Sequence, residues 1–435
     1  MSRVSKNRCR QLVGITLFIL IYRITLDYIY VNVISPVWSY QHFYTDINNT
    51  FLYISYVWIF FMCLFDNKLY EDKRPSSIFL LLLDFLFFIP LSSVIPLSGM
   101  NLDFFIYCLI YWSLVALFQV YYLKKSPKYI PQSTIENKGA SLYFYIAAII
   151  IGLNFLVSLY YFGFHLKFDL QDVYDIRYEV RDLHLPTAVK YLKPIASKLT
   201  LITILVVIIK KKYIWLIPLI LIQLENFAFG ALKSDFFALL LVFVVGFFYE
   251  TKHLQYIFYG LIVANAIVII EYSLTGVSLF SIIIHRRVLF MPSILSNEYF
   301  TFFSNHELVY LRDSFMRHFG LHSPYDLEVP MLIGREFYDS PEANCNTGII
   351  GDDFAQLGWL SLLVFPFLRY KILTLYDKVL SPCEEKMIVY VSFLFSLVFI
   401  SGTFFSSLIT GGFLVILLLI YILIKKNNKK VKIKI

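Results

Sequence analysis

The chain has 435 residues, of which 59% are hydrophobic and 16% are charged. Soluble domains carry about 25% charged residues, so this composition excludes an ordinary soluble protein and indicates a polytopic membrane protein. The net charge of +8 does not indicate nucleic-acid binding, because the positive residues lie in short segments between apolar stretches. The predicted fold class is all-α, with about twelve transmembrane helices and one large external loop.

Apolar stretches of spanning length, which is roughly 20 residues with about 17 as a lower limit, recur along the chain. The first follows a basic run from Arg3 to Arg10 and lacks a small-residue cleavage site, so we interpret it as an uncleaved helix. The predicted spans are 12–35, 49–65, 76–98, 102–123, 140–163, 194–209, 213–229, 235–249, 254–272, 351–368, 386–402 and 404–424.

The predicted spans divide the chain into three parts. Residues 1–272 hold nine spans with an external loop at 164–193, residues 273–350 form the large external loop, and residues 351–435 hold the last three spans and a basic tail. Most of the 38 lysine and arginine residues fall on one side of this arrangement. By the positive-inside rule, both termini are cytoplasmic and the two loops face outward.

The external loop at 164–193 carries a candidate anion site. Arg177 and Arg181 are four residues apart and share one face if the segment is helical. Two forked guanidiniums suit a diphosphate. The alternative is that Asp175 or Glu179 neutralises them. Glu179 is also a candidate catalytic base.

A short turn between the seventh and eighth spans places Lys233 near a helix N-terminus, which favours anion binding. The alternative is that Lys233 extends its side chain to the membrane–water interface and binds no ligand.

The segment Thr275–Ile350 interrupts an otherwise apolar chain, and we interpret it as polar and cationic. Arg286 and Arg287 follow an apolar run and could hold a lipid-linked phosphate or contact a headgroup. The candidate proton carriers of this loop are His306, His318 and His322. Simple exposed loop histidines are the alternative.

Asp352 and Asp353 stand where the chain re-enters the membrane. As a metal site they lack the further ligands that magnesium needs, and as helix N-terminal carboxylates they are ordinary. No metal or cofactor is expected. The cysteines are scattered, with Cys345 in the large loop, and predict no disulfide framework.

Ionisable residues also occur inside the predicted spans. Arg23 and Asp27 are one turn apart and are expected to pair. Asp84 and Glu225 are costly in lipid and should face a bundle interior or cavity. On these residues alone, a proton-coupled transporter is an open alternative.

Three patches resemble one family. The patch Asn346-Thr347-Gly348-Ile349-Ile350-Gly351-Asp352, followed by Phe354-Ala355 and Leu357-Gly358, resembles the signature that closes the large external loop of O-antigen and capsule repeat-unit polymerases of the Wzy type. Arg287-Val288-Leu289-Phe290-Met291-Pro292, then Tyr299-Phe300, resembles the start of that loop. Lys233-Ser234 resembles the short basic turn of the family.

The resemblance implies a reaction at the outer face of the inner membrane. A growing glycan leaves undecaprenyl diphosphate and is transferred to the sugar end of a new lipid-linked repeat unit. A chain-length regulator and a flippase are the implied partners besides membrane lipid. Arginines and a lysine could stabilise the leaving diphosphate without metal, and the substrate-binding candidates are Arg177, Arg181, Lys233, Arg286, Arg287 and Asn346.

The base that takes the acceptor proton is left open among three residues, Asp352, His318 and Glu179. Two other functions fit the architecture: an O-antigen ligase, which uses the same carrier, and a flippase or transporter, which catalyses no transfer.

Overall fold

The computed structural model describes residues 3–130, 140–163, 185–230, 233–249, 254–313 and 316–424. This described part is all-helical apart from one isolated β-bridge between Asp46 and Ser98. Nine of its helices are long and apolar enough to cross a membrane. The protein is thus an all-helical, polytopic membrane protein. The predicted spans at 213–229, 235–249 and 386–402 correspond to shorter apolar helices.

The chain divides into two compact units. Unit 1 comprises residues 1–130, 252–375 and 396–406, and unit 2 comprises residues 131–251, 376–395 and 407–435. The large loop, residues 276–350, therefore belongs to the same unit as the first four predicted spans.

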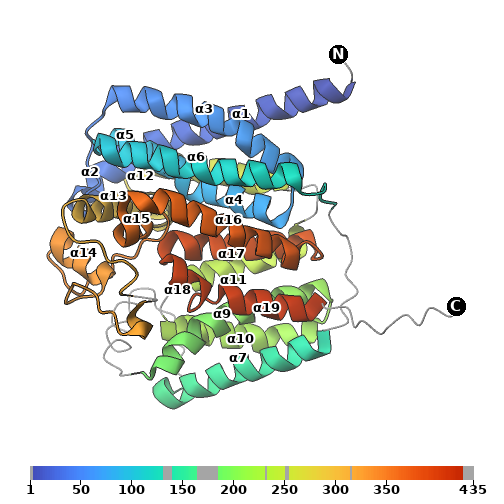
Figure 1. Ribbon diagram of the computed structural model, residues 1–435. Coiled ribbons are helices and arrows are strands. Elements are labelled where there is room, and N and C mark those ends of the chain that lie inside the picture. Colours follow the sequence, from blue (N-terminus) through green and yellow to red (C-terminus); the bar gives the residue numbers. More distant parts are fainter. Residues whose placement is uncertain are drawn as a thin grey trace. The chain divides into compact units, whose positions relative to one another are not determined.

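Unit 1 contains the N-terminal helices, among them α1, α3, α5 and α6, which are blue to cyan in Figure 1. Its helices are α1 (Arg3–Ile29), α2 (Ser35–Trp38), α3 (Asn49–Asp72), α4 (Pro75–Leu83), α5 (Ile89–Leu97), α6 (Leu102–Lys125), α12 (Leu254–Thr275), α13 (Met291–Phe303), α14 (Val329–Tyr338) and α15 (Gly351–Leu357). Its π-helical segments are Tyr30–Ile34, Asp84–Phe88 and Ser281–Phe290, and its short 3-10 turns are Ser39–Gln41, Met316–Phe319 and Gly358–Leu360.

The helices of unit 2 are α7 (Ala140–Phe162), α9 (Thr187–Ile209), α10 (Leu216–Gly230), α11 (Lys233–Phe243) and α19 (Phe413–Ile424), with a 3-10 turn at Tyr213–Trp215 and a π-helical segment at Val244–Phe248. Helices α16 (Ser361–Leu380), α17 (Glu385–Ser401) and α18 (Phe404–Leu408) contribute residues to each unit.

The centre of unit 1 is the span Pro75–Leu97, which joins α4 and α5. Its most apolar 18-residue stretch is 100% buried, whereas that of Phe258–Thr275 in α12 is only 17% buried. A helix that is apolar all round and buried belongs to a core, while an exposed apolar helix suits lipid. Pro90 lacks an amide donor, and the π-helical turn Asp84–Phe88 immediately before it absorbs the break in the helical hydrogen bonds.

Three loop segments meet at one end of unit 1, which we call the loop-bearing end: residues 39–48, 98–101 and 276–350. The amides of Asp46 and Asn48 donate to the carbonyls of Leu97 and Pro96 at 2.9 and 2.8 Å. Side-chain bonds then join residues 39–48 to the large loop. Helices α13 and α14 mark this end at the left of Figure 1.

The opposite end of unit 1 carries basic residues. The Arg74 guanidinium donates to the carbonyl of Pro127 at 3.2 Å and lies 5.2 Å from the ring centroid of Tyr122. Lys124 and Lys128 are exposed close by in the sequence. The segregation of loops and basic residues to opposite ends is the pattern on which the predicted orientation depends.

Labelling of single engineered cysteines tests this orientation. Cysteine placed at the exposed positions Asn305 and Lys128 should react with a membrane-impermeant maleimide from outside only at position 305. Position 128 should react only after the membrane is permeabilised. Both variants carry Cys9→Ser as well, and the protein with that change alone sets the background, because Cys63, Cys108, Cys345 and Cys383 are all buried. The reverse labelling pattern would show that the predicted orientation in the membrane is wrong.

Candidate functional site

His42 and Glu298 form a hydrogen-bonded pair at the loop-bearing end. His42 Nδ1 lies 2.6 Å from Glu298 Oε1, and the hydroxyl of Tyr338 donates to the same oxygen at 2.9 Å. The side chain of Glu298, in α13, is only 4% exposed, while that of His42 is 26% exposed. Because Glu298 engages Nδ1, a proton exchanged with a ligand would pass through Nε2 of His42.

Local backbone geometry and aromatic stacking fix the orientation of the His42 ring. His42 ends the 3-10 turn Ser39–Gln41 in the left-handed region, with φ of 62°, a conformation in which histidine is enriched among non-glycine residues. Its ring stacks on that of Tyr338, with centroids 4.9 Å apart, and on that of Tyr44, at 5.8 Å. A ring held by stacking on two tyrosines and by its Nδ1 is preorganised for proton transfer.

The two side chains of this pair shift each other's pKa. The hydrogen bond to Glu298 raises the pKa of His42 above its ordinary value, against the opposing effect of burial. Burial raises the pKa of Glu298, and the hydrogen bond to His42 opposes this. Burial and the adjacent Glu298 raise the pKa of Tyr338, so its hydroxyl remains a neutral donor. With its pKa raised in this way, the His42 imidazole is a stronger base than it would be without Glu298.

Arg286 lies beside this pair. Its Nη1 donates to Gln41 Oε1 at 2.5 Å, and its guanidinium carbon lies 3.8 Å from the ring centroid of Trp38. Stacking on an aromatic ring together with a hydrogen bond restricts the fork to one orientation. A cation suited to phosphate oxygens is therefore bonded to Gln41, the residue that precedes the candidate base. Arg287 follows and is exposed.

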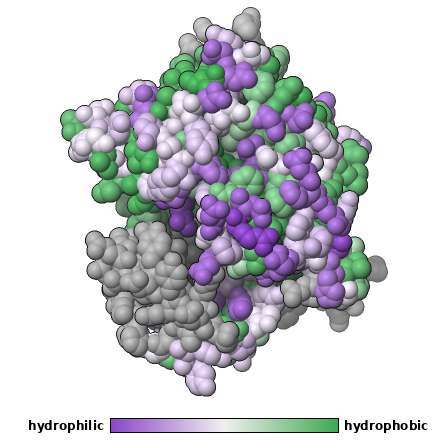
Figure 2. All heavy atoms as spheres, turned by 90° about the vertical axis from the view of Figure 1, so that its left-hand side faces the viewer, coloured by the Kyte–Doolittle hydropathy of each residue, from purple (hydrophilic) through white to green (hydrophobic). Residues whose placement is uncertain are grey.

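The large loop as a whole is not cationic, which corrects the expectation from its arginines. Residues 275–350 contain more carboxylates than arginines. Figure 2 views the molecule from this side and shows hydrophilic side chains gathered on it. The exposed carboxylates of the loop are Glu307, Asp326, Glu328, Glu336, Asp339 and Glu342. Among the loop arginines whose side chains are described, Arg312 and Arg335 pair with carboxylates, which leaves Arg286 and Arg287 as the cations suited to an anion.

The two carboxylates at the start of α15 are buried. Asp353 accepts hydrogen bonds from the hydroxyl of Tyr111 at 2.5 Å and from Arg369 Nη2 at 2.6 Å, and Arg369 Nε donates to the Tyr111 hydroxyl at 2.7 Å. This closed triad ties α15 to α6 and α16. Asp352 accepts from Gln356 Nε2 at 3.1 Å. Asp352, a predicted catalytic residue, is 2% exposed and lies beside a structural ion pair.

Close backbone packing explains the glycines in the segment that resembles the family signature. A Cβ on Gly348 would lie 2.1 Å from the carbonyl oxygen of Phe399, and a Cβ on Gly351 would lie 2.9 Å from the Cα of Ser296. Neither backbone position has room for a larger residue. These glycines therefore fasten the end of the loop to α13 and α17.

A strained turn separates the loop from the buried carboxylates. Ile350 has φ of 77° and ψ of −68°, and the amide of Gly351 donates to the carbonyl of Ile349 at 3.1 Å. This is the rare γ-turn that is unfavourable for a β-branched residue. On the loop side of the turn Asn346 is exposed, whereas Asp352 on the helix side is buried. The turn thus directs these two predicted site residues into different surroundings.

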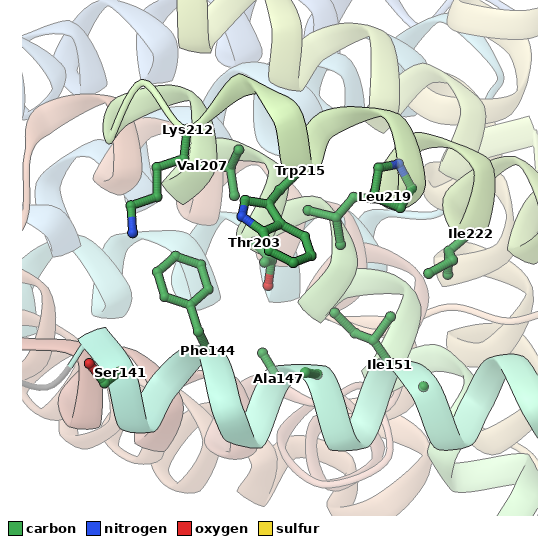
Figure 3. Close-up of a pocket in the computed structure, with 13 residues that line it drawn as sticks. Ser141, Phe144, Ala147, Ile151, Thr203, Val207, Lys212, Trp215, Leu219 and Ile222 are labelled. Atoms are coloured by element: carbon green, nitrogen blue, oxygen red, sulfur yellow. The ribbon is translucent and has the colours of Figure 1, made fainter.

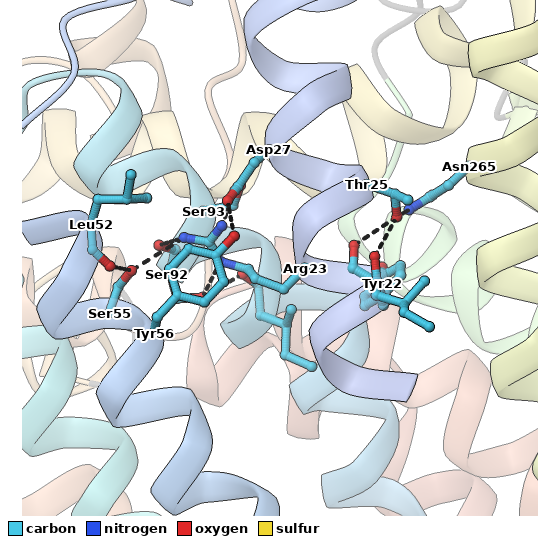
Figure 4. A network of polar contacts seen from close by, with 12 residues as sticks. Tyr22, Arg23, Thr25, Asp27, Leu52, Ser55, Tyr56, Ser92, Ser93 and Asn265 are labelled. Atoms are coloured by element: carbon cyan, nitrogen blue, oxygen red, sulfur yellow. Dashed lines mark hydrogen bonds and ion pairs between the residues drawn. The ribbon is translucent and has the colours of Figure 1, made fainter. Parts of the chain in front are cut away.

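A second polar network lies within the spans of unit 1 (Figure 4). Arg23 pairs with Asp27, as predicted from their spacing. Arg23 Nη2 also donates to the carbonyl of Ser92 at 2.7 Å and to Ser55 Oγ at 3.2 Å, and the Tyr56 hydroxyl donates to Asp27 Oδ2 at 2.6 Å. The charges are satisfied by side chains of α1, α3 and α5, so this network stabilises the packing of three spans.

The other ionisable residues inside predicted spans contact residues of neighbouring helices. Asp84 is buried and interacts with Asp66 of α3 and with Trp112 of α6. Glu225, in α10, interacts with the positive charge of Lys193 in α9. Both carboxylates face a bundle interior, as predicted.

The side chains of five predicted site residues lie outside the described part of the structure. Arg177, Glu179 and Arg181 lie outside the described residues. Lys233 begins α11 and His318 lies in the turn Met316–Phe319, and only their backbones are described. No described contact joins the other two predicted histidines, His306 and His322, to Glu298. The ring of His306 stacks on that of Phe302 at 4.0 Å, and His322 is exposed.

Sequence reasoning missed both members of the acid–base pair. They are 256 positions apart, and Glu298 lies in a segment that we expected to be loop. The signal that could have found His42 is weak: it is a histidine in a short external loop that contains no lysine or arginine.

Breaking the Asp353–Arg369 pair should destabilise the protein strongly. Removing one partner leaves an uncompensated buried charge, which costs about 3–5 kcal/mol. Arg369→Met should therefore lower the thermal unfolding midpoint in detergent, and adding Asp353→Asn should restore part of the loss. Arg335→Ala is the control, because its ion pairs with Asp326 and Glu336 are exposed. An unchanged midpoint for Arg369→Met would show that this triad does not hold the helices.

The chain has no significant match to a protein-family model, to a curated protein or to a solved structure.

Proposed function

We propose that the protein is an oligosaccharide repeat-unit polymerase, a glycosyltransferase that moves a growing glycan from undecaprenyl diphosphate to a new lipid-linked repeat unit. The observation that carries the proposal is the His42–Glu298 pair beside Arg286, at the end of unit 1 that the charge distribution predicts to face outward. The resemblance of the Asn346–Asp352 patch to the family signature supports the same reaction.

The proposed reaction needs one base and one cation. His42 Nε2 takes the proton from the acceptor hydroxyl as the hydroxyl oxygen bonds to the anomeric carbon of the donor. The bond from that carbon to the diphosphate oxygen breaks, and its electron pair leaves with undecaprenyl diphosphate. Arg286 stabilises the charge that develops on the leaving group, with Arg287, Arg181 and Lys233 as further candidates. Glu298 orients His42 and stabilises its protonated form.

Deletion of the gene in its native host tests this function. A polymerase defect should leave single repeat units on the surface acceptor, and His42→Ala should reproduce that pattern at wild-type protein levels. A ligase defect would instead leave no repeat units on the acceptor. A flippase defect would leave lipid-linked units on the cytoplasmic face. Either of these patterns would overturn the proposal.

The proposed transfer should not depend on a divalent metal. Within the described ranges, no group of three or more His, Cys, Asp or Glu side chains could hold a metal ion, and octahedral magnesium needs several oxygen ligands. Chain extension by purified protein should therefore survive EDTA. Loss of extension that magnesium or manganese restores would contradict this mechanism.

A further inference from the structure

Unit 2 contains an apolar cavity that the proposed reaction does not use (Figure 3). Its volume is about 500 Å³, and it lies between α7, α9 and the start of α10. Ligand pockets in proteins are typically of this size. The residues around its wall are mostly apolar, including Phe144, Ile151, Val207, Trp215 and Leu219.

Small residues on α7 create the hollow. Ala147, Ala148 and Gly152 line it, and a Cβ built on Gly152 would have no atom within 4 Å. The one hydroxyl of the α9 wall, that of Thr203, is already bonded to the carbonyl of Leu199 at 2.7 Å. The other polar side chains of the lining, Ser141 and Lys212, lie at the end of the cavity near Phe144 (Figure 3). The rest of the cavity therefore suits an apolar occupant, and hydrocarbon is the occupant that a membrane supplies.

Two lysines stand at one side of the opening. The Nζ atoms of Lys210 and Lys212 each lie 5.9 Å from the ring centroid of Phe144. The amides of Lys211 and Lys212 donate to the carbonyls of Ile208 and Val207, and Lys211 has φ of 56°. This pattern is a Schellman motif with lysine at the left-handed position, and it turns the chain back across the end of α9.

The surrounding surface suits a membrane interface. Trp215 is 60% exposed and Ile214 is 80% exposed, and tryptophan is enriched at the level of lipid headgroups. Burial is the larger cause that lowers the pKa of Lys210, and the nearby positive charge of Lys212 lowers it further. The two ammonium groups therefore repel each other at the opening. An anion between the two ammonium groups would relieve that repulsion.

We propose that this cavity is a binding site for an anionic glycerophospholipid, with one acyl chain in the hollow and the phosphate headgroup on Lys210 and Lys212. The site lies at the end of unit 2 that carries Lys210–Lys212, so it takes lipid from the leaflet that the positive-inside rule makes cytoplasmic. It is separate from the transfer site and does not depend on the proposed reaction.

Quenching of Trp215 by brominated lipid tests the proposal on the full-length protein in detergent. Phosphatidylglycerol with brominated acyl chains should quench saturably, and the quenched component should disappear in Trp215→Phe. Brominated phosphatidylcholine should bind far more weakly. Each lysine near the headgroup contributes about fivefold in affinity, so Lys210→Ala with Lys212→Ala should weaken binding roughly twenty-fivefold. Lys124→Ala with Lys128→Ala is the matched control and should not change it.

A variant that fills the cavity provides the second test. Gly152→Leu should abolish saturable quenching while the unfolding midpoint stays near that of wild type. Gly260→Leu is the matched control, because a Cβ at that helical glycine also meets no atom within 4 Å and does not line the cavity. Equal quenching by both lipids, or unchanged affinity in the double lysine variant, would overturn the proposal. Wild-type binding by a folded Gly152→Leu variant would do so as well.

Discussion

His42→Ala should reduce the rate of chain extension by about 10²- to 10⁴-fold, which is the usual contribution of a positioned general base. The ring is held by Glu298 and by stacking on Tyr338 and Tyr44, so no neighbouring group can take its place without rearrangement. The measurement is the initial rate of polymer formation by purified protein with lipid-linked repeat units.

The pH profile distinguishes a base from a merely structural histidine. The base must be neutral, so the rate should rise as pH increases through the pKa of His42. Glu298 raises that pKa. Glu298→Gln should therefore move the acidic limb of the profile to lower pH and lower the plateau, because the imidazole becomes a weaker base. The rate should be measured between about pH 5 and 8, the range in which histidine side chains change charge.

His322→Ala is the control, since His322 is an exposed histidine of the large loop at the same end of unit 1, and it should extend chains at the wild-type rate. Two outcomes would contradict the assignment: a fully active His42→Ala, or a Glu298→Gln profile with an unmoved acidic limb. If His322→Ala were the inactive variant, the base would lie in the large loop and not at His42.

Arg286→Ala should cost about 2.7–4 kcal/mol of transition-state stabilisation, which is the range measured for loss of one donor to a developing anion. That energy corresponds to a fall in rate of about a hundredfold or more. Arg286→Lys should also be poor, because an ammonium cannot reproduce the fork that bonds Gln41 and stacks on Trp38. Glycan chain length at matched protein levels and initial rates in vitro are the two measurements.

Arg335→Ala is the control for loss of positive charge in the same loop, because Arg335 forms exposed ion pairs with Asp326 and Glu336. It should extend chains normally. Alanine variants of Arg287, Arg181 and Lys233 measure how many cations share the diphosphate. If Arg286 and all three of these tolerated alanine, the leaving group would not be stabilised by arginine or lysine, and a transport function would become the better explanation.

The sequence by itself determined the class of protein and the features that depend on nearby residues. The long apolar runs require membrane helices, because each must satisfy its backbone hydrogen bonds internally in lipid. The Arg23–Asp27 pair follows from a spacing of one helical turn. Both features were predictable, since hydropathy and helical periodicity are local properties.

Only the tertiary structure decided how distant residues combine. The pairing of His42 with Glu298 spans 256 positions and depends on how residues 39–48 pack against α13. In the sequence, Asp352 and Asp353 were ordinary helix N-terminal carboxylates, with Asp352 also a candidate base. In the structure, Tyr111 and Arg369, from two other helices, bond to Asp353, which is buried. Local patterns carry no information about which helices pack together, and burial by those neighbours is the physical property that separates a structural carboxylate from a reactive one.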